Sequence, residues 1–140
     1  MTRVMLTIIA ALGLCLSLTG SAGAQLTAAE RAKRTNDLKQ LGLAFHNYND
    51  TFKKGPAKAA DLGPFIENDK RLLGLLDNKD IVFQFGVSVA EMMADGLSNT
   101  VLAYDKDVPT KGGLVLMADA SVKSMTAEEF KKAKLATSKK

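Results

Sequence analysis

The chain has 140 residues and a formal net charge of +4. Its one cysteine and one histidine, Cys15 and His46, exclude internal disulfide bonds, cysteine-built zinc sites and sites that need two histidines. The charge excess is small and the chain has only six Phe and two Tyr, so we expect no nucleic-acid partner.

Residues 1–24 have the pattern of a cleaved secretory signal peptide. Arg3 precedes an uncharged apolar stretch over residues 4–18, and Ala22 and Ala24 supply the small residues that signal peptidase requires. The stretch is shorter than the roughly 20 residues that a membrane span needs. We therefore expect a mature chain that begins at Gln25, has no membrane span and is secreted or periplasmic.

A long helix is predicted directly after the signal. Thr27 and Glu30 have capping-box spacing, which marks a helix start. The first half of this helix is heavily charged, so we expect it to project into water. Residues 53–56, Lys-Lys-Gly-Pro, predict its end. Apolar residues at steps of three and four predict a buried stripe, made of Leu38, Leu41, Phe45, Tyr48 and Phe52.

The remaining elements follow in the order of an α+β domain. Pro64 and the polar residues 67–69 predict two short helices between residues 59 and 78. Capping-box spacing at Thr126 predicts a last helix through Leu135, followed by a disordered lysine-rich tail from about residue 136. We expect Met92 and Met93 to fill the core. β-branched and aromatic residues predict strands over 81–85, 100–104, 113–118 and 122–125.

These elements predict one domain over residues 25–140, in which the long helix lies across a small antiparallel sheet of three or four strands. Three segments of it together resemble a known family. Residues 36–50 read NDLKQLGLAFHNYND, residues 95–102 read DGLSNTVL, and residues 113–122 read GLVLMADASV. They are similar to segments of the prepilin-like domains of unknown function that are common in planctomycetes and often carry an H-X9-DG signature. The resemblance implies a pilin-like layout and brings no catalytic residues.

The chain departs from that family in two places. An Ala-x-Ala site follows its apolar stretch, where the family usually has a type IV prepilin leader that is retained. The H-X9-DG element is missing, and Ala120 stands where a turn glycine is expected. A primed hairpin turn requires a positive φ there, which costs alanine about 1 kcal/mol. We therefore expect Ala120→Gly to stabilise the protein.

His46 is the one candidate for acid–base chemistry. It lies four residues before Asp50, and catalysis would require this pair to face a nucleophile such as Ser98 or Ser121. Neither serine lies in a Gly-x-Ser-x-Gly elbow, so we expect a structural role for His46.

Four aspartates at the predicted strand ends offer oxygen ligands for calcium if they converge on one rim. Residues 105–109 lack the central glycine and closing glutamate of an EF-hand loop, and aspartate is also an ordinary turn residue. These calcium candidates are Asp95, Asp105, Asp107 and Asp119.

We expect a non-enzymatic, exported domain with a structural or interaction role at the cell envelope. Its expected partner is an envelope protein or an anionic polymer, contacted through the charged half of the long helix or the lysine-rich tail. One alternative is a small module that binds calcium or an anionic polymer. A more remote alternative is a hydrolase built on His46 and a serine. Apart from calcium, no cofactor is indicated.

Overall fold

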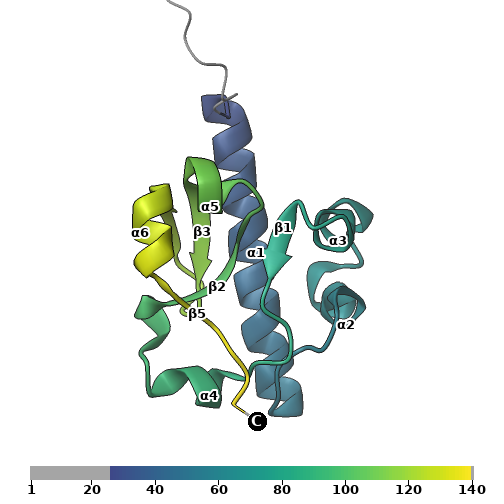
Figure 1. Ribbon diagram of the computed structural model, residues 1–140. Helices are drawn as coiled ribbons and strands as arrows, with labels where there is room; N and C mark the ends of the chain where they lie inside the picture. Colours follow the sequence, from purple (N-terminus) through teal and green to yellow (C-terminus); the bar gives the residue numbers. More distant parts are fainter. Residues whose placement is uncertain (1–25, 140) are drawn as a thin grey trace, which may run out of the picture.

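The computed structural model describes residues 26–139, so the predicted signal peptide and the expected start at Gln25 lie outside it. Helix α1 (Ala28–Phe52) lies along one face of a small sheet, and short helices surround the rest (Figure 1). The predicted α+β class and the long N-terminal helix are confirmed. Among the helices within residues 26–139, none combines the length and apolar character needed to span a membrane.

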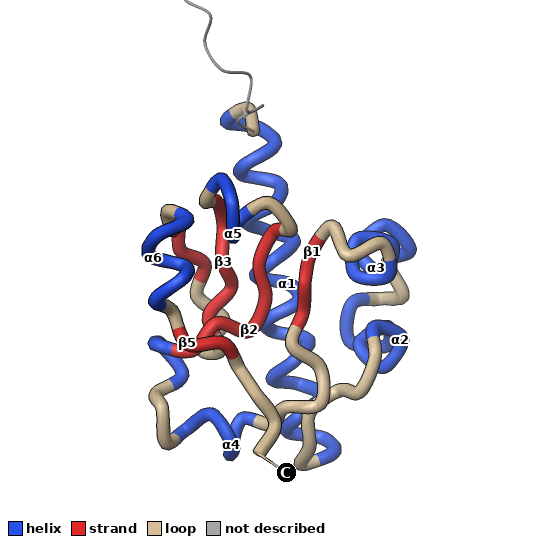
Figure 2. Tube along the Cα trace, in the orientation of Figure 1, coloured by secondary structure: helices blue, strands red, loops and turns tan. Residues whose placement is uncertain are grey.

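The other elements are short (Figure 2). The helical ones are α2 (Ala59–Leu62), η1 (Gly63–Ile66), α3 (Lys70–Asp77), α4 (Val89–Met93), η2 (Leu97–Asn99), α5 (Val108–Lys111) and α6 (Ala127–Lys132). The strands are β1 (Ile81–Phe83), β2 (Thr100–Asp105), β3 (Gly113–Met117), β4 (Val122–Met125) and β5 (Lys134–Leu135).

Strands β1 to β4 form an antiparallel sheet, as predicted, and they neighbour one another in chain order. The register places Val82 opposite Tyr104 and Val115 opposite Lys123. The fifth strand was not expected: β5 runs parallel to the start of β2, with Thr100 opposite Lys134. Because β1 pairs with the end of β2 and β5 with its start, these two strands share one edge of β2.

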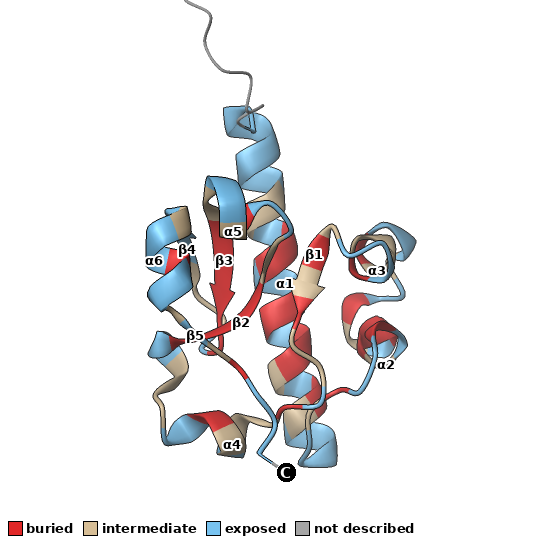
Figure 3. Ribbon diagram, viewed as in Figure 1, coloured by how far each residue is buried: buried red, intermediate tan, exposed pale blue. Residues whose placement is uncertain are grey.

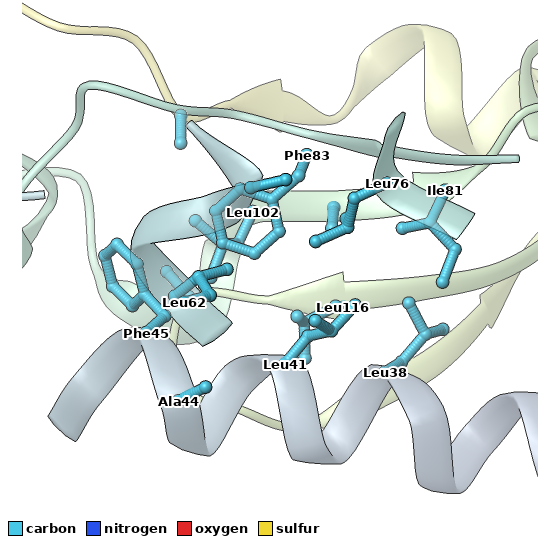
Figure 4. Packing of buried hydrophobic residues seen from close by; sticks show 14 of the residues in the cluster. Leu38, Leu41, Ala44, Phe45, Leu62, Leu76, Ile81, Phe83, Leu102 and Leu116 are labelled. Atoms are coloured by element: carbon cyan, nitrogen blue, oxygen red, sulfur yellow. The ribbon is translucent and has the colours of Figure 1, made fainter. Parts of the chain in front are cut away.

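The sheet is covered on both faces, which explains why β3 is apolar throughout. Side chains alternate between the faces of a strand, so Leu114 and Leu116 point to one side and Val115 and Met117 to the other. The first pair belongs to the larger core cluster, with α1, α2 and α3. The second pair belongs to a smaller cluster with Phe130 of α6. Figure 4 shows the larger cluster, in which Leu38, Leu41 and Phe45 of α1 meet Leu116 and Leu102 of the sheet.

The two parts of α1 differ in burial (Figure 3). The predicted capping box is present, since the Thr27 amide donates to Glu30 Oε2 at 2.8 Å and the Glu30 amide donates to Thr27 Oγ1 at 3.2 Å. Residues 28–36, which we call the projecting segment, contain no buried residue. Burial begins at Asp37, which accepts two hydrogen bonds from Arg71 of α3, at 2.8 and 2.7 Å.

Two apolar residues expected in the core lie at the surface instead. Phe52 is 52% exposed because it lies in the last turn of α1, where its ring packs beside those of Tyr48 and Phe65 at centroid distances of 4.6 and 6.4 Å. Met93 is 66% exposed while its neighbour Met92 is buried. The pair lies on the unexpected helix α4, where adjacent residues point in different directions.

The C-terminal prediction is wrong in two respects. Helix α6 ends at Lys132 rather than continuing through Leu135, because the backbone becomes extended at Ala133 and joins the sheet as β5. The tail was expected to be disordered from about residue 136, but Ala136 is buried and its amide donates to the Val101 carbonyl at 2.8 Å. The Lys139 amide then donates to Glu91 at 3.2 Å, so the tail lies against α4.

Candidate functional site

The three segments that carry the family resemblance meet at the β3–β4 turn. Nε2 of His46, on α1, donates a hydrogen bond to the carbonyl of Ala118 at 2.7 Å. The Ala118 amide in turn donates to the carbonyl of Thr100, at the start of β2, at 2.8 Å. Ala118 is fully buried, so each of these backbone groups needs a protein partner. His46 therefore fixes α1 to the hairpin.

Gly42 and Ala120 make the closest approach between α1 and this turn. A Cβ atom on Gly42 would lie 2.9 Å from Ala120 Cβ and 3.0 Å from Leu116 Cδ1, so only glycine fits there without a shift. Ala120 has a φ of 68°, as its place in the turn predicts, and this region strains an L-alanine. The motif residues thus encode a tight helix–hairpin contact.

The residues of the hydrolase hypothesis are not assembled into a triad in the described part of the chain. The Nε2 atom of His46 is engaged by a backbone carbonyl, and no hydrogen bond within residues 26–139 joins His46 to Asp50, Ser98 or Ser121. The Ser121 hydroxyl instead donates to Asp119. Burial raises the pKa of Asp119, but the hydrogen bonds from the Ser121 hydroxyl and amide lower it, and the net effect is a lowered pKa.

The four calcium candidates have separate partners. Asp95 forms an ion pair with Lys134, whose hydrogen bond lowers the pKa of Asp95. Asp119 is bonded within its own turn. Only Asp105 and Asp107 line the same cleft. Within residues 26–139, no group of three or more histidine, cysteine, aspartate or glutamate side chains is placed to hold a metal ion.

A cleft of about 890 Å³ lies beside the projecting segment, and we call it the α1 cleft. Its walls come from α1, from the loop ends around β1 and β2, from the α5–β3 junction and from the start of α6. Gly112 lets the chain turn tightly at this junction, because its φ is 72° and a Cβ atom there would lie 2.7 Å from the Met125 carbonyl. Its charged lining residues are Arg31, Arg34, Asp80, Asp105, Lys106, Asp107, Lys111 and Glu129.

Two ion pairs lie in the lining of this cleft. Arg34 Nη1 lies 3.2 Å from Oδ1 of Asp105, and both side chains are largely buried. Burial raises the pKa of Asp105, and the nearby guanidinium of Arg34 only partly offsets that effect. The second pair, Lys106 with Asp80 at 2.6 Å, is exposed, and the hydrogen bond from Lys106 lowers the pKa of Asp80.

Comparison with known proteins finds a similarity in the first part of the chain. Residues 27–86 match the family model described as "Protein of unknown function (DUF1559)". The predicted resemblance to a family of unknown function is confirmed there. The match runs from the α1 cap to the residues just after β1, so the segments at 95–102 and 113–122 lie beyond it. No curated protein and no solved structure matches the chain.

Sequence reasoning named Asp105 and Asp107 but missed Arg34 as a site residue. Arg34 is one of several basic residues in a charged helix, and neither spacing nor periodicity distinguishes it from Arg31 or Lys33. Its position follows from the fold, because it lies one turn before the first buried residue of α1 and faces the end of β2. Lys111 and Gly112 also form part of the cleft wall, although no motif in the sequence marks them.

Proposed function

We propose that this protein is an exported domain with a structural or interaction role at the cell envelope, and that the projecting segment makes its contact. The observation that carries the proposal is the layout of α1. Its first nine residues extend past the core without a buried residue, whereas the sheet and the other helices pack on its later turns (Figure 3).

The projecting segment is maintained as a helix although none of its residues belongs to the buried core. An isolated helix of this length is marginal in water. The segment is supported by its capping box and by its continuation into the packed turns. A charged, preformed helix that its own domain leaves uncovered is suited to contact a partner, because little conformational entropy is lost on binding.

The resemblance to prepilin-like domains supports the same function. The resemblance implies a pilin-like layout, with a long N-terminal helix across a small sheet, and brings no catalytic residues. The present chain has the same arrangement of helix and sheet. Its expected Ala-x-Ala site favours release of the leader, so we propose contact through the polar start of α1 rather than through a retained apolar helix.

Site-specific cross-linking in cells of the source organism tests this role. Lys33→Cys places a thiol on the projecting segment, and Lys70→Cys places one at the start of α3 as the matched control, since both lysines are exposed. Cys15 is the one native cysteine and lies in the segment expected to be removed. A photo-activated label on residue 33, but not on residue 70, should cross-link an envelope component.

Export is tested separately by N-terminal sequencing of the fractionated protein. We expect the mature chain to begin at Gln25 in the secreted or periplasmic fraction.

Equal cross-linking from residues 33 and 70, or none from residue 33, contradicts the proposed contact. Recovery of the intact chain in the cytoplasm contradicts export.

A further inference from the structure

Arg34 lines the α1 cleft, and one of its hydrogen-bond donors has no acceptor among residues 26–139. Its Nη1 atom is buried and has no hydrogen-bond partner among residues 26–139, although it lies 3.2 Å from Asp105 Oδ1. The ion pair is close, but its geometry does not form a hydrogen bond. Buried donors are nearly always paired, and an unpaired one costs about 1–3 kcal/mol, or more when charged. This donor is therefore ready for an acceptor supplied by a ligand.

Two further cations line the same cleft without a partner in the described chain. Neither Arg31 nor Lys111 forms an ion pair within residues 26–139. The acidic groups of the cleft are mostly engaged. Asp80 is bound by Lys106, and Glu129 accepts the Thr126 amide at 2.7 Å as part of the α6 capping box.

Asp107 is the remaining acidic residue of the cleft, and its side chain accepts no hydrogen bond from the described residues. Once the ion pairs Arg34–Asp105 and Lys106–Asp80 are set aside, the basic groups Arg31 and Lys111 face the carboxylates of Asp107 and Glu129. The cleft volume of about 890 Å³ lies within the range typical of small-molecule sites.

We propose that the α1 cleft binds an oxyanion, the carboxylate or phosphate group of a small ligand, with Arg34 as the anchor and Arg31 and Lys111 as supporting cations. A guanidinium group matches the geometry of such oxygens and binds them more strongly than a neutral donor does. The pKa of Asp105, which burial raises, fits a site where the internal carboxylate compensates Arg34 incompletely. The site shares Arg31 and Arg34 with the projecting segment, but oxyanion binding and the proposed envelope contact are separate properties with separate tests.

Nuclear magnetic resonance titration of the purified protein tests the site. The probes are sodium phosphate and sodium acetate, with sodium chloride at equal ionic strength as the control for screening. We expect saturable shifts of the Arg34 side-chain N–H signal and of the Gly112 and Gly113 amides with phosphate, acetate or both. The two arms identify which oxyanion is bound. Shifts that do not saturate, or that chloride reproduces, overturn the proposal.

Three variants assign the binding to the cleft. Lys111→Gln, at an exposed residue, should weaken binding about tenfold, the usual effect of losing one charged hydrogen bond. Arg34→Lys keeps the charge and should weaken oxyanion binding by a similar factor, because an ammonium group cannot replace the two parallel N–H donors of a guanidinium group. Lys33→Gln is the matched control outside the cleft and should bind as wild type. Equal weakening in Lys33→Gln and Lys111→Gln would show general charge attraction and overturn the site, whereas the cross-linking result would not change.

Discussion

The two halves of α1 have the same secondary structure for different physical reasons. From Asp37 to Tyr48 one face of the helix is buried against the sheet, and Leu38, Leu41 and Phe45 are completely inaccessible. From Ala28 to Asn36 no residue is buried, and the helix is supported by its cap and its continuation. The comparison teaches that tertiary packing stabilises the later turns, and that the earlier turns remain accessible to other molecules.

The largest difference between the halves is expected on deleting a side chain from each. Phe45→Ala should lower the free energy of unfolding by about 3–5 kcal/mol, because a fully buried ring that contacts Phe83 leaves a cavity. Lys33→Ala should change it by less than about 0.5 kcal/mol. Urea denaturation measures both. Similar shifts for the two variants would show that the projecting segment is packed in solution.

His46→Ala should have the next largest effect. Removing the imidazole leaves the buried Ala118 carbonyl without its donor, which costs about 1–3 kcal/mol. Asn47→Ala, at the exposed neighbouring position, controls for the change in helix propensity and should be near neutral. Thermal melting compares the two variants, and equal melting temperatures would mean that the hydrogen bond contributes no net stability.

Substitutions at Gly42 and Ala120, where the packed half of α1 meets the β3–β4 turn, should have coupled effects on stability. Ala120→Gly should raise the free energy of unfolding by up to about 1 kcal/mol, because glycine removes the strain at a φ of 68°. Gly42→Ala should lower it by about 1–3 kcal/mol, because the new Cβ collides with Ala120 and Leu116. In the double variant Gly42→Ala should cost less, since one of the colliding atoms is gone. Additive effects in a double-mutant cycle would show that the turn moves away instead.

The smallest expected effect is on the titration of Glu30, which makes the stability of the projecting segment depend on pH. Hydrogen bonds from the Thr27 amide and hydroxyl lower the pKa of Glu30 in the folded chain. The cap therefore contributes stability at neutral pH, and this contribution is lost as the pH falls through the lowered folded-state pKa. Thr27→Ala should move the Glu30 pKa back toward its usual range and should slightly lower the urea midpoint at neutral pH, because the cap is lost. Carboxyl titration by nuclear magnetic resonance measures it, and an unchanged pKa would show that the Thr27 hydroxyl contributes little.

Local signals in the sequence predicted the parts of the fold that local interactions determine. The capping boxes at Thr27 and Thr126, the stripe from Leu38 to Tyr48 and the positive φ of Ala120 all follow from a few neighbouring residues. The unbroken apolar run of β3 also indicates that both faces of the sheet are covered, which the sequence analysis did not predict. Such a run is typical of a strand covered on both faces, and it predicts the second layer formed by α5 and α6.

The remaining features depend on contacts between distant segments. Strand β5 has only two residues, which pair with Thr100 and Val101, so it is too short to be predicted from a periodic pattern. The exposure of Phe52 and Met93 depends on where neighbouring elements end. The α1 cleft joins residues from both ends of the described chain, and its anchor Arg34 is an ordinary basic residue until the end of β2 is placed opposite it.

The parallel strand β5 has a consequence for association between copies of the chain. It fills the part of the β2 edge that β1 leaves open. An unpaired strand edge is a template on which another chain can add a strand. The two short strands together therefore shield the main chain of β2 from such edge-to-edge pairing.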